Sequence, residues 1–151
     1  MDGRVRGYDS FVGTSFGDFN RNLIADLREH GGEATFGPFK GRRVLILTTK
    51  GAKSGETREN PLVYTRDGAN LVIVASKGGA PTNPSWYHNL RTHPEVTVEV
   101  GGEKFIATAR ITDGPEYDRL FKQHADTNPG FYDYLKKTTR KIPVIVLERI
   151  G

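Results

Sequence analysis

The stretch "ENPLVYTRDGANLVIVAS", residues 59–76, carries the clearest structural signal in the chain. Two apolar runs, "PLVY" and "LVIVA", flank Asp67-Gly68, and this dipeptide is typical of a two-residue β-hairpin turn. The sequence therefore predicts two antiparallel strands, at 59–66 and 70–76, joined by a tight turn.

Segments on both sides of this hairpin extend the same pattern. Residues 95–100, "EVTVEV", alternate between apolar and polar side chains, and Gly101-Gly102 then turns the chain. Further strands are expected at 42–49, 103–112 and 142–150, and helices at 16–30, 84–92, 113–125 and 128–139. Hairpin connections favour antiparallel pairing, and closure hides the sheet edges. The expected fold is mainly β, a six-stranded barrel with helical insertions.

Composition limits the classes of function. The chain has 151 residues, the size of one ordinary domain, and it has no cysteine, which excludes disulfides and thiolate metal sites. No H-E-x-x-H motif is present, and no strand-to-helix nucleophile elbow is expected, so neither a metal site nor a serine hydrolase is expected. The net charge of +4 favours anionic ligands, although lysines on a solvated surface explain it equally well. The basic residues lie in glycine turns, which argues against nucleic acid as a partner.

The N-terminal segment, residues 1–38, is expected to carry an amphipathic helix ahead of the barrel domain at 39–151. Five apolar residues share one face of this helix: Phe16, Phe19, Leu23, Ile24 and Leu27. Packing on the barrel is the favoured interpretation, and contact with a lipid interface is the alternative. No signal peptide or membrane-spanning run is apparent, so a cytoplasmic location is expected, with peripheral contact at the inner face of the plasma membrane left open.

Two loops have the character of anion-binding turns. In "SKGGAPTNPSWYHNL", residues 76–90, Gly78-Gly79 permit close approach to the backbone, and Lys77 adds a cation. The helix expected to start at Pro84, with Asn83 as its cap, adds N–H groups and a positive dipole end. The alternative is a simple glycine turn in which Trp86 packs in the core.

The loop "TKGAKSGETREN", residues 49–60, is the second cationic candidate. Lys50, Lys53 and Arg58 lie around two glycines, with Ser54 and Thr57 as hydroxyl donors. Its alternative is a solvated turn. If the neighbouring strands pair, both loops can serve one ligand.

Three segments together resemble the deazaflavin-dependent nitroreductase and quinone reductase family. They are "GAKSGETRENPL" (51–62), "ASKGGAPTNPSWYHNLRTHPEVTVEV" (75–100) and "IPVIVLER" (142–149), and the resemblance spans roughly residues 40–150. It implies a split β-barrel similar to the pyridoxamine-phosphate-oxidase-like and FMN-binding-like barrels. It also implies coenzyme F420 as cofactor, with its phosphate and acidic glutamate tail.

The resemblance further implies the residues that bind this cofactor. Lys53 and Arg58 are expected to meet phosphate or carboxylates, and residues 61–63 and 74–76 to line the flat ring. The full implied set is Lys53, Ser54, Arg58, Asn60, Pro61, Leu62, Val63, Val74, Ala75, Ser76, Lys77, Ser85, Trp86, Tyr87 and Asn89.

The implied chemistry is hydride transfer from the reduced deazaflavin to a quinone, a nitro compound or an activated double bond. Ser76 is expected to hydrogen-bond near the ring, and the phenol of Tyr134, or alternatively Tyr132, to serve an acceptor oxygen. Read from the residues alone, the segment around Tyr134 favours amphipathic packing. Val63, Phe131 and Tyr134 are the implied substrate contacts.

The sequence also departs from the best-known nitroreductases of this family, in which tyrosines crowd the substrate pocket. Val63, Asn128 and Phe131 occupy three such positions here, which puts bulky nitroaromatics in doubt. Two other functions stay open: a split-barrel oxidoreductase that binds flavin mononucleotide, and a carrier of the cofactor or of a lipid without catalysis.

Overall fold

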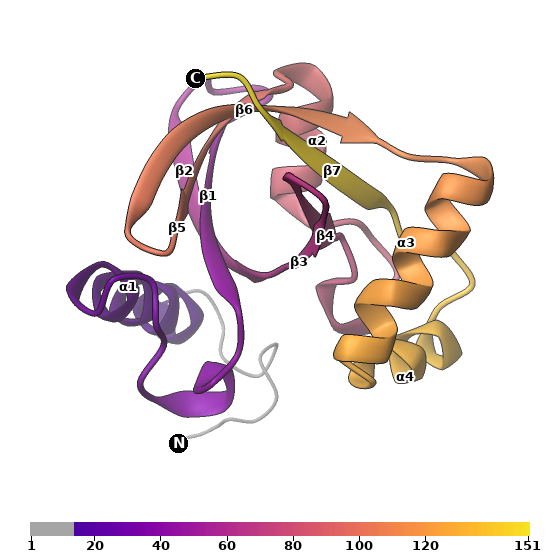
Figure 1. Ribbon diagram of the computed structural model, residues 1–151, viewed down its shortest axis with the longest axis horizontal. Coiled ribbons are helices and arrows are strands. Elements are labelled where there is room, and N and C mark those ends of the chain that lie inside the picture. Colours follow the sequence, from indigo (N-terminus) through magenta and orange to yellow (C-terminus); the bar gives the residue numbers. More distant parts are fainter. Residues whose placement is uncertain (1–13) are drawn as a thin grey trace.

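A curled antiparallel sheet forms the centre of the structure (Figure 1), which is a computed structural model describing residues 14–151, with side chains from Gly17 onward. Within these residues the sheet has seven strands in the order β2-β1-β5-β6-β7-β4-β3. The strands are β1 (Val44–Lys50), β2 (Thr57–Val63), β3 (Thr65–Asp67), β4 (Asn70–Val74), β5 (Glu95–Val100), β6 (Glu103–Ile111) and β7 (Val144–Arg149).

The helices lie around this sheet and at its ends. The α-helices are α1 (Thr14–Glu29), α2 (Ser85–Thr92), α3 (Gly114–Thr127) and α4 (Gly130–Lys137), and two short 3-10 turns are η2 (Gly37–Phe39) and η3 (Lys77–Gly79). In Figure 1, α1 lies on one flank of the sheet, and α3 and α4 lie on the other.

The two outer strands of the sheet, β2 and β3, are consecutive in the chain. β2 pairs only with β1, and β3 pairs only with β4, through the hairpin predicted at Asp67-Gly68. The chain crosses from one edge to the other at Tyr64, whose N–H donates to the carbonyl of Arg43 at 3.1 Å. The sheet therefore curls into a split barrel, as predicted.

This crossing corrects the predicted strand count. The segment 59–66 was expected to be one strand, but Tyr64 leaves the ladder with β1 and divides it into β2 and β3. The sheet consequently has seven strands instead of six. The strand predicted at 70–76 is also shorter, since β4 ends at Val74 and leaves Ala75 and Ser76 in the following loop.

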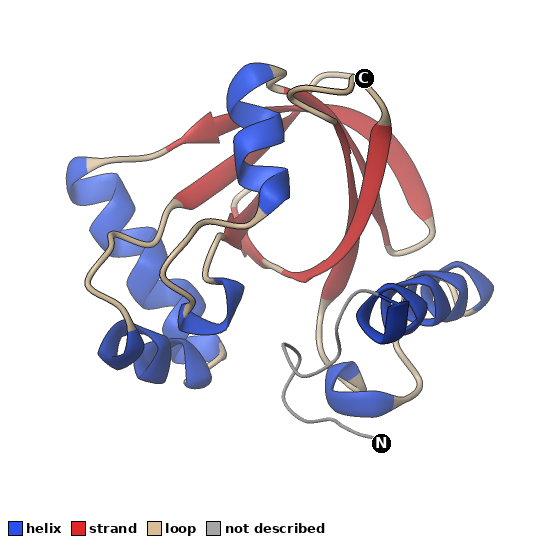
Figure 2. Ribbon diagram, turned by 180° about the vertical axis from the view of Figure 1, so that it is seen from behind, coloured by secondary structure: helices blue, strands red, loops and turns tan. Residues whose placement is uncertain are grey.

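Alternating side chains of the strands fill the barrel. Leu45, Leu47, Ile73, Val98 and Ile145 are fully buried in its core. Helix α2 lies across the back of the barrel (Figure 2) and adds Trp86, Tyr87 and Leu90 to the same cluster. The N-cap of α2 is Pro84, whose ψ of 156° is extended, so the predicted pair of Asn83 as cap and Pro84 as first helical residue is wrong by one position.

Helix α1 packs its apolar face against the outside of β1. Leu23, Ile24 and Leu27 are buried in one cluster with Val44 and Ile46, and Phe19 packs against it. The interpretation of α1 as a helix packed on the barrel is therefore confirmed for these residues, while the side chain of Phe16 lies outside the described residues. Among residues 14–151, no helix combines the length and the apolar character needed to cross a bilayer.

Helices α3 and α4 cover the other flank. Leu120, Phe121 and Ala125 of α3 are buried against Val72 and Val74 of β4 and against Ile142, Val144 and Val146. Phe131 and Tyr134 of α4 pack against the same cluster, which brings α4 close to the loop that follows β4.

Candidate active site

The loop after β4 has an unusual backbone. Three successive residues have positive φ angles: Lys77 at 48°, Gly78 at 63° and Gly79 at 84°. Lys77 is the only residue other than glycine with a positive φ among residues 14–151. Such conformations cost energy for side-chain-bearing residues and are frequent at functional sites. Ser76, immediately before this left-handed turn, is buried, whereas the Lys77 side chain is exposed.

Arg140 is the residue that holds this loop, and the sequence reasoning missed it. Its guanidinium donates to the carbonyl oxygens of Ala75 (3.3 Å), Ser76 (2.7 Å) and Ala80 (2.9 Å) and to Oδ1 of Asn83 (2.6 Å). All these partners lie 57–65 residues earlier in the chain. No local motif marks such a contact, so only the fold could reveal it.

Asn89 of α2 holds the β1–β2 loop, the second cationic loop, against that helix. Its Nδ2 donates to Thr49 Oγ1 at 3.0 Å, and its Oδ1 accepts from the Ala52 N–H at 3.0 Å. Both ends of this buried amide are therefore used inside the protein. The structure shows Asn89 fixing the β1–β2 loop against α2, and its expected contact with the cofactor stays a prediction.

The β1–β2 loop is a tight turn that presents a cation. The Gly51 N–H donates to the carbonyl of Glu56 at 2.7 Å, and a Cβ at Gly51 would lie 2.6 Å from Ser54 Oγ, so a side chain there would displace the Ser54 hydroxyl. Ser54 Oγ accepts from the Glu56 N–H at 3.1 Å. Lys53 is exposed and makes no hydrogen bond or ion pair with any described residue.

Arg58, expected beside Lys53 at the anionic tail, already has partners. Its Nη1 donates to a carboxylate oxygen of Glu56 at 3.0 Å and to the carbonyl of Thr57 at 3.2 Å. The pair is exposed, so it is weak and can exchange for another anion.

The predicted residues of β2 do not share one environment. Asn60 is half-buried and Pro61 is buried, while Leu62 packs on the barrel core. Val63 packs in the α1 cluster, whereas Phe131 and Tyr134 pack in the α3 cluster. The three implied substrate contacts are therefore distributed over two clusters on different flanks of the sheet.

The predicted residues of α2 divide by burial. Ser85 is exposed in the first turn, while Trp86 and Tyr87 are 5% and 9% exposed within the barrel core. Trp86 therefore packs in the core, as the alternative interpretation of this loop expected.

Helix α4 is in contact with the left-handed turn. A Cβ at Gly79 would lie 3.0 Å from Lys137 Cβ and 3.2 Å from the Tyr134 carbonyl oxygen, so the missing side chain permits this approach. The ring centroids of Phe131 and Tyr134 are 5.1 Å apart in an edge-to-face arrangement. Tyr134 and Ser76 are therefore on elements that touch.

Beneath α4 lies a buried histidine that the sequence left without a role. His124 is fully buried, and burial lowers its pKa to about 4, so it is neutral at pH 7. Its Nδ1 is 3.2 Å from Thr65 Oγ1, and its ring lies edge-to-face on Phe131 at 4.6 Å. Asn128 caps the end of α3, with Nδ2 donating to the His124 carbonyl at 3.2 Å, and is itself buried.

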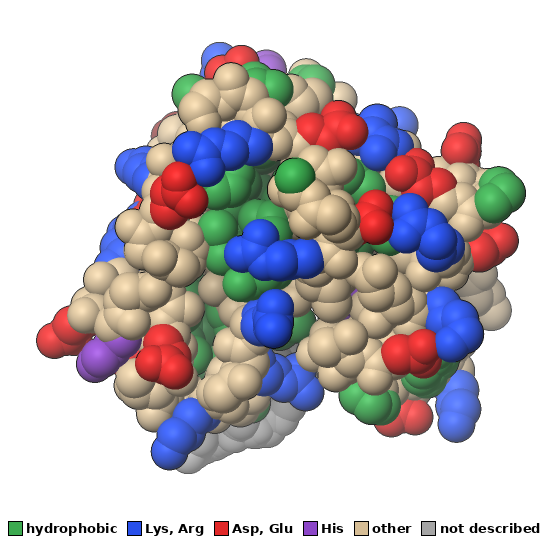
Figure 3. All heavy atoms as spheres, in the orientation of Figure 1, with side chains coloured by type: hydrophobic (Ala, Val, Ile, Leu, Met, Phe, Trp, Pro, Cys, Tyr) green, Lys and Arg blue, Asp and Glu red, His purple; other side chains and the backbone are tan. Residues whose placement is uncertain are grey.

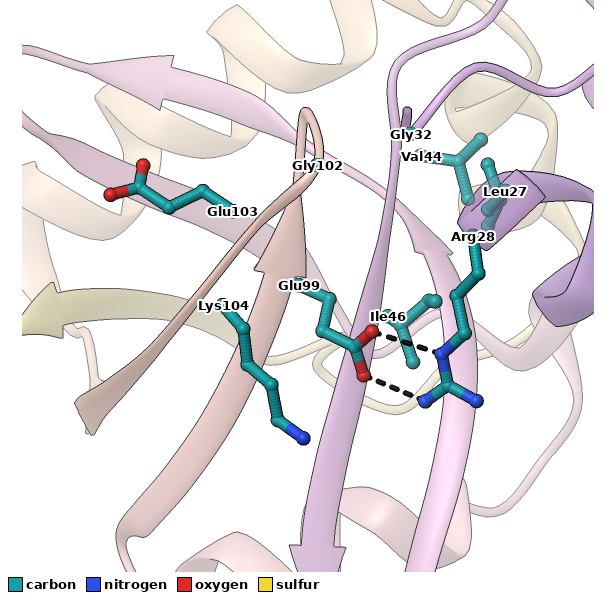
Figure 4. Close-up of a pocket in the computed structure, with 9 residues that line it drawn as sticks. All are labelled: Leu27, Arg28, Gly32, Val44, Ile46, Glu99, Gly102, Glu103 and Lys104. Atoms are coloured by element: carbon teal, nitrogen blue, oxygen red, sulfur yellow. Dashed lines mark hydrogen bonds and ion pairs between the residues drawn. The ribbon is translucent and has the colours of Figure 1, made fainter. Parts of the chain in front are cut away.

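Two cavities lie away from these residues. One, of about 130 Å³, lies between α1, β1 and the β5–β6 hairpin (Figure 4). Two of its charged residues are already paired, since Arg28 donates to both oxygens of Glu99 at 2.9 and 2.7 Å, and Arg28 also donates to Glu59 at 2.6 Å.

The other cavity, of about 240 Å³, lies at the barrel mouth between the β3–β4 and β5–β6 hairpins. Figure 3 shows a hollow on that face, with apolar side chains at its bottom and lysine or arginine side chains across it. Among its lining residues, Arg149 pairs with Glu103 at 2.7 Å and lies over the Phe105 ring at 4.5 Å. Among residues 14–151, no group of three or more His, Asp or Glu side chains could hold a metal ion.

Comparison with known proteins shows which class of protein has this fold. The chain is similar to a solved F420-H2 dependent reductase, FDR-A, with 39% identity and a TM-score of 0.66 over 71% of this chain and 95% of that one. A Listeria innocua structure assigned as a pyridoxamine 5′-phosphate oxidase has a TM-score of 0.51 at 12% identity, over 87% of this chain and 93% of that one, and supports the fold alone. The fold is therefore that of the split-barrel reductases.

The family follows from two further matches. Residues 19–149 match the family model of F420H(2)-dependent quinone reductases. An F420H(2)-dependent quinone reductase of Mycobacterium tuberculosis is 44% identical over 108 residues, covering 70% of this chain and 72% of that protein. The chain belongs to the F420H(2)-dependent quinone reductase family. It is an oxidoreductase, and its cofactor is coenzyme F420.

Proposed function

We propose that the protein binds reduced coenzyme F420 between the β1–β2 loop and the loop after β4, and that it reduces a quinone there. The observation that carries the proposal is the pair of hydrogen bonds at Asn89, one accepted from the Ala52 N–H and one donated to Thr49, which hold the β1–β2 loop on the helix that follows the second loop. We infer that the two cationic segments, separate in sequence, serve one ligand because the first is held on the helix that follows the second.

The residues present suit a multiply anionic ligand. Lys53 makes no interaction with a described residue, and Lys77 makes only a long hydrogen bond of 3.4 Å to Thr82 Oγ1. Uncommitted ammonium groups beside glycine-rich backbone favour phosphate and carboxylate groups. Ser54 and Ser85 add hydroxyl donors at the same loops, and Arg58 can exchange its exposed carboxylate partner for the ligand.

The bound cofactor supplies a hydride, and this chain's residues position the two reactants. We assign the buried hydroxyl of Ser76 as a hydrogen-bond donor beside the ring, with Pro61 and Val74 as apolar contacts. We assign the phenol of Tyr134 to the oxygen of the acceptor, because α4 touches the turn that begins after Ser76. A donor placed at an oxygen that gains charge accelerates such a transfer.

The aromatic surface of α4 favours a quinone over a bulky nitroaromatic compound. Phe131 offers no hydroxyl, Asn128 is consumed as a helix cap, and Val63 packs against α1. The site thus has few groups to bind nitro oxygens, while Phe131 and Tyr134 offer ring faces for a flat acceptor. A cytoplasmic location, with contact at the inner face of the plasma membrane to reach a lipid-soluble quinone, is part of this proposal.

The experiment is a titration followed by a turnover assay. Fluorescence titration with coenzyme F420 should show saturable binding, and flavin mononucleotide should not compete at similar concentration. Oxidation of the reduced cofactor should then require a menaquinone analogue and should be slower with nitroaromatic acceptors. Tight binding without oxidation by any acceptor would instead identify a carrier, and preferential binding of flavin mononucleotide would overturn the cofactor assignment in this proposal.

A further inference from the structure

We propose that Arg140 is a positioning residue that holds the left-handed turn Lys77–Gly79 in the geometry that binds the cofactor. This inference rests on the proposed function, since it concerns the same site. Arg140 lies between α4 and β7, so it is remote in sequence from the loop after β4, and its hydrogen bonds connect it to that loop.

The bonds of Arg140 surround the turn on both sides. Ala75 and Ser76, whose carbonyls it binds, precede Lys77, and the Ala80 carbonyl and the Asn83 side chain follow Gly79. Within the turn, the local bonds are those from the Gly79 N–H to the Ser76 carbonyl at 2.9 Å and from the Ala80 N–H to the Lys77 carbonyl at 3.1 Å. One planar guanidinium therefore fixes the relative position of both ends.

The backbone of Lys77 needs such support. A lysine at φ 48° is in a conformation that side-chain-bearing residues rarely adopt, and it persists only where the surroundings determine it. On one side the support is α4 packed on Gly79, and on the other it is Arg140. Without Arg140, we expect Lys77 to relax toward negative φ and to move its ammonium group and the Ser76 hydroxyl.

The choice of partners also points to positioning. Arg140 forms no ion pair with any described residue, and each hydrogen bond of its guanidinium goes to a neutral oxygen. By contrast, Arg110 pairs with Glu116 at 2.7 Å and with Glu148 at 3.2 Å. A lysine would keep the charge of Arg140 but could not reproduce four bonds in one plane. Arg140→Lys therefore separates the effect of the hydrogen-bond geometry of Arg140 from the effect of its positive charge.

The test compares Arg140→Lys, Arg140→Met and the control Arg110→Met, which removes a guanidinium of β6 whose partners are Glu116 and Glu148 and not residues of this turn. Amide hydrogen exchange of residues 77–80 is measured without cofactor, and the Kd for coenzyme F420 is measured by fluorescence titration. Both Arg140 variants should exchange faster in this segment. Both should bind the cofactor about tenfold or more weakly, because ordering one or two loop residues on binding has this cost. Arg110→Met should match wild type in both measurements at a comparable melting temperature.

The outcomes separate the two proposals. Faster exchange together with weaker binding in both Arg140 variants supports positioning. Wild-type affinity in Arg140→Lys would show that charge suffices and would overturn the inference, as would unchanged exchange in Arg140→Met. Failure of wild type to bind coenzyme F420 at all would refute the proposed site, whereas the exchange data would still report whether Arg140 holds the turn. If Arg140→Met does not fold, Arg140→Lys decides.

Discussion

Replacing Asn89 by leucine should loosen the β1–β2 loop and weaken cofactor binding together. The Asn89 side chain is 7% exposed, and its substitution leaves the Ala52 N–H and the Thr49 hydroxyl without their partner. Each such loss costs about 1–2 kcal/mol, so the free energy of unfolding should fall by about 2–4 kcal/mol. In a chain of this length, the melting temperature should fall by roughly 5–15 °C.

The assay is urea unfolding of wild type, Asn89→Leu, Thr49→Val and the double variant. The Thr49–Asn89 hydrogen bond predicts a coupling energy of about 0.5–1.5 kcal/mol in this cycle. Titration with coenzyme F420 should show roughly tenfold weaker binding by Asn89→Leu, because the loop that carries Lys53 must then be ordered on binding. A stability loss below about 0.5 kcal/mol together with wild-type affinity would show that the Asn89 amide neither stabilises the β1–β2 loop nor prepares it for cofactor binding.

Four further substitutions test separate parts of the account. Lys53→Ala should weaken cofactor binding by about 1.5–3 kcal/mol without changing the melting temperature. The control Lys122→Ala on α3 should leave the Kd for the cofactor unchanged. A Kd of Lys53→Ala equal to that of wild type would remove Lys53 from the site. Tyr134→Phe should lower kcat more than it changes the Kd for the cofactor, and unchanged steady-state turnover would reduce Tyr134 to packing. His124 has a folded pKa of about 4 because of burial, so only the unfolded state takes up its proton as the pH falls from about 6.5 to 4, and about 3 kcal/mol of stability is lost over that window. His124→Gln should flatten this dependence in urea unfolding, and an undiminished slope would contradict the assignment. Gly79→Ala should destabilise the protein by about 1–3 kcal/mol, through its φ of 84° and the contact at 3.0 Å with Lys137; thermal unfolding at the wild-type temperature would show that α4 moves aside without cost.

The sequence predicted the strands well where pattern and turn chemistry agree. Alternation in 95–100 matches β5 residue for residue, and the expected hairpin forms, although its turn is Gly68-Ala69, one residue later than predicted, because Asp67 pairs with Asn70. The division of one predicted strand at Tyr64 could not be foreseen, because it depends on the carbonyl of Arg43 and on the path between two sheet edges.

The candidate site was predictable only in part. Glycines and lysines in turns identified both cationic loops, since their chemistry is local. In the interpretation from sequence, a shared ligand depended on pairing of the neighbouring strands; β2 and β4 do not pair, and Asn89 connects the β1–β2 loop to α2. Arg140 has partners 57–65 residues away, and Trp86 is buried by the curvature of the sheet, so neither role appears in any short stretch of sequence.

Hydrogen exchange of the protein with and without coenzyme F420 is the most direct test that the two cationic loops bind the cofactor, because it locates the ligand without relying on activity. If both loops bind the cofactor, binding should slow amide exchange in residues 50–56 and 75–89. It should not change exchange in the β5–β6 hairpin, beside the cavity that Arg28 and Glu99 line. Protection at that hairpin or at the barrel mouth, with both cationic loops unchanged, would contradict it.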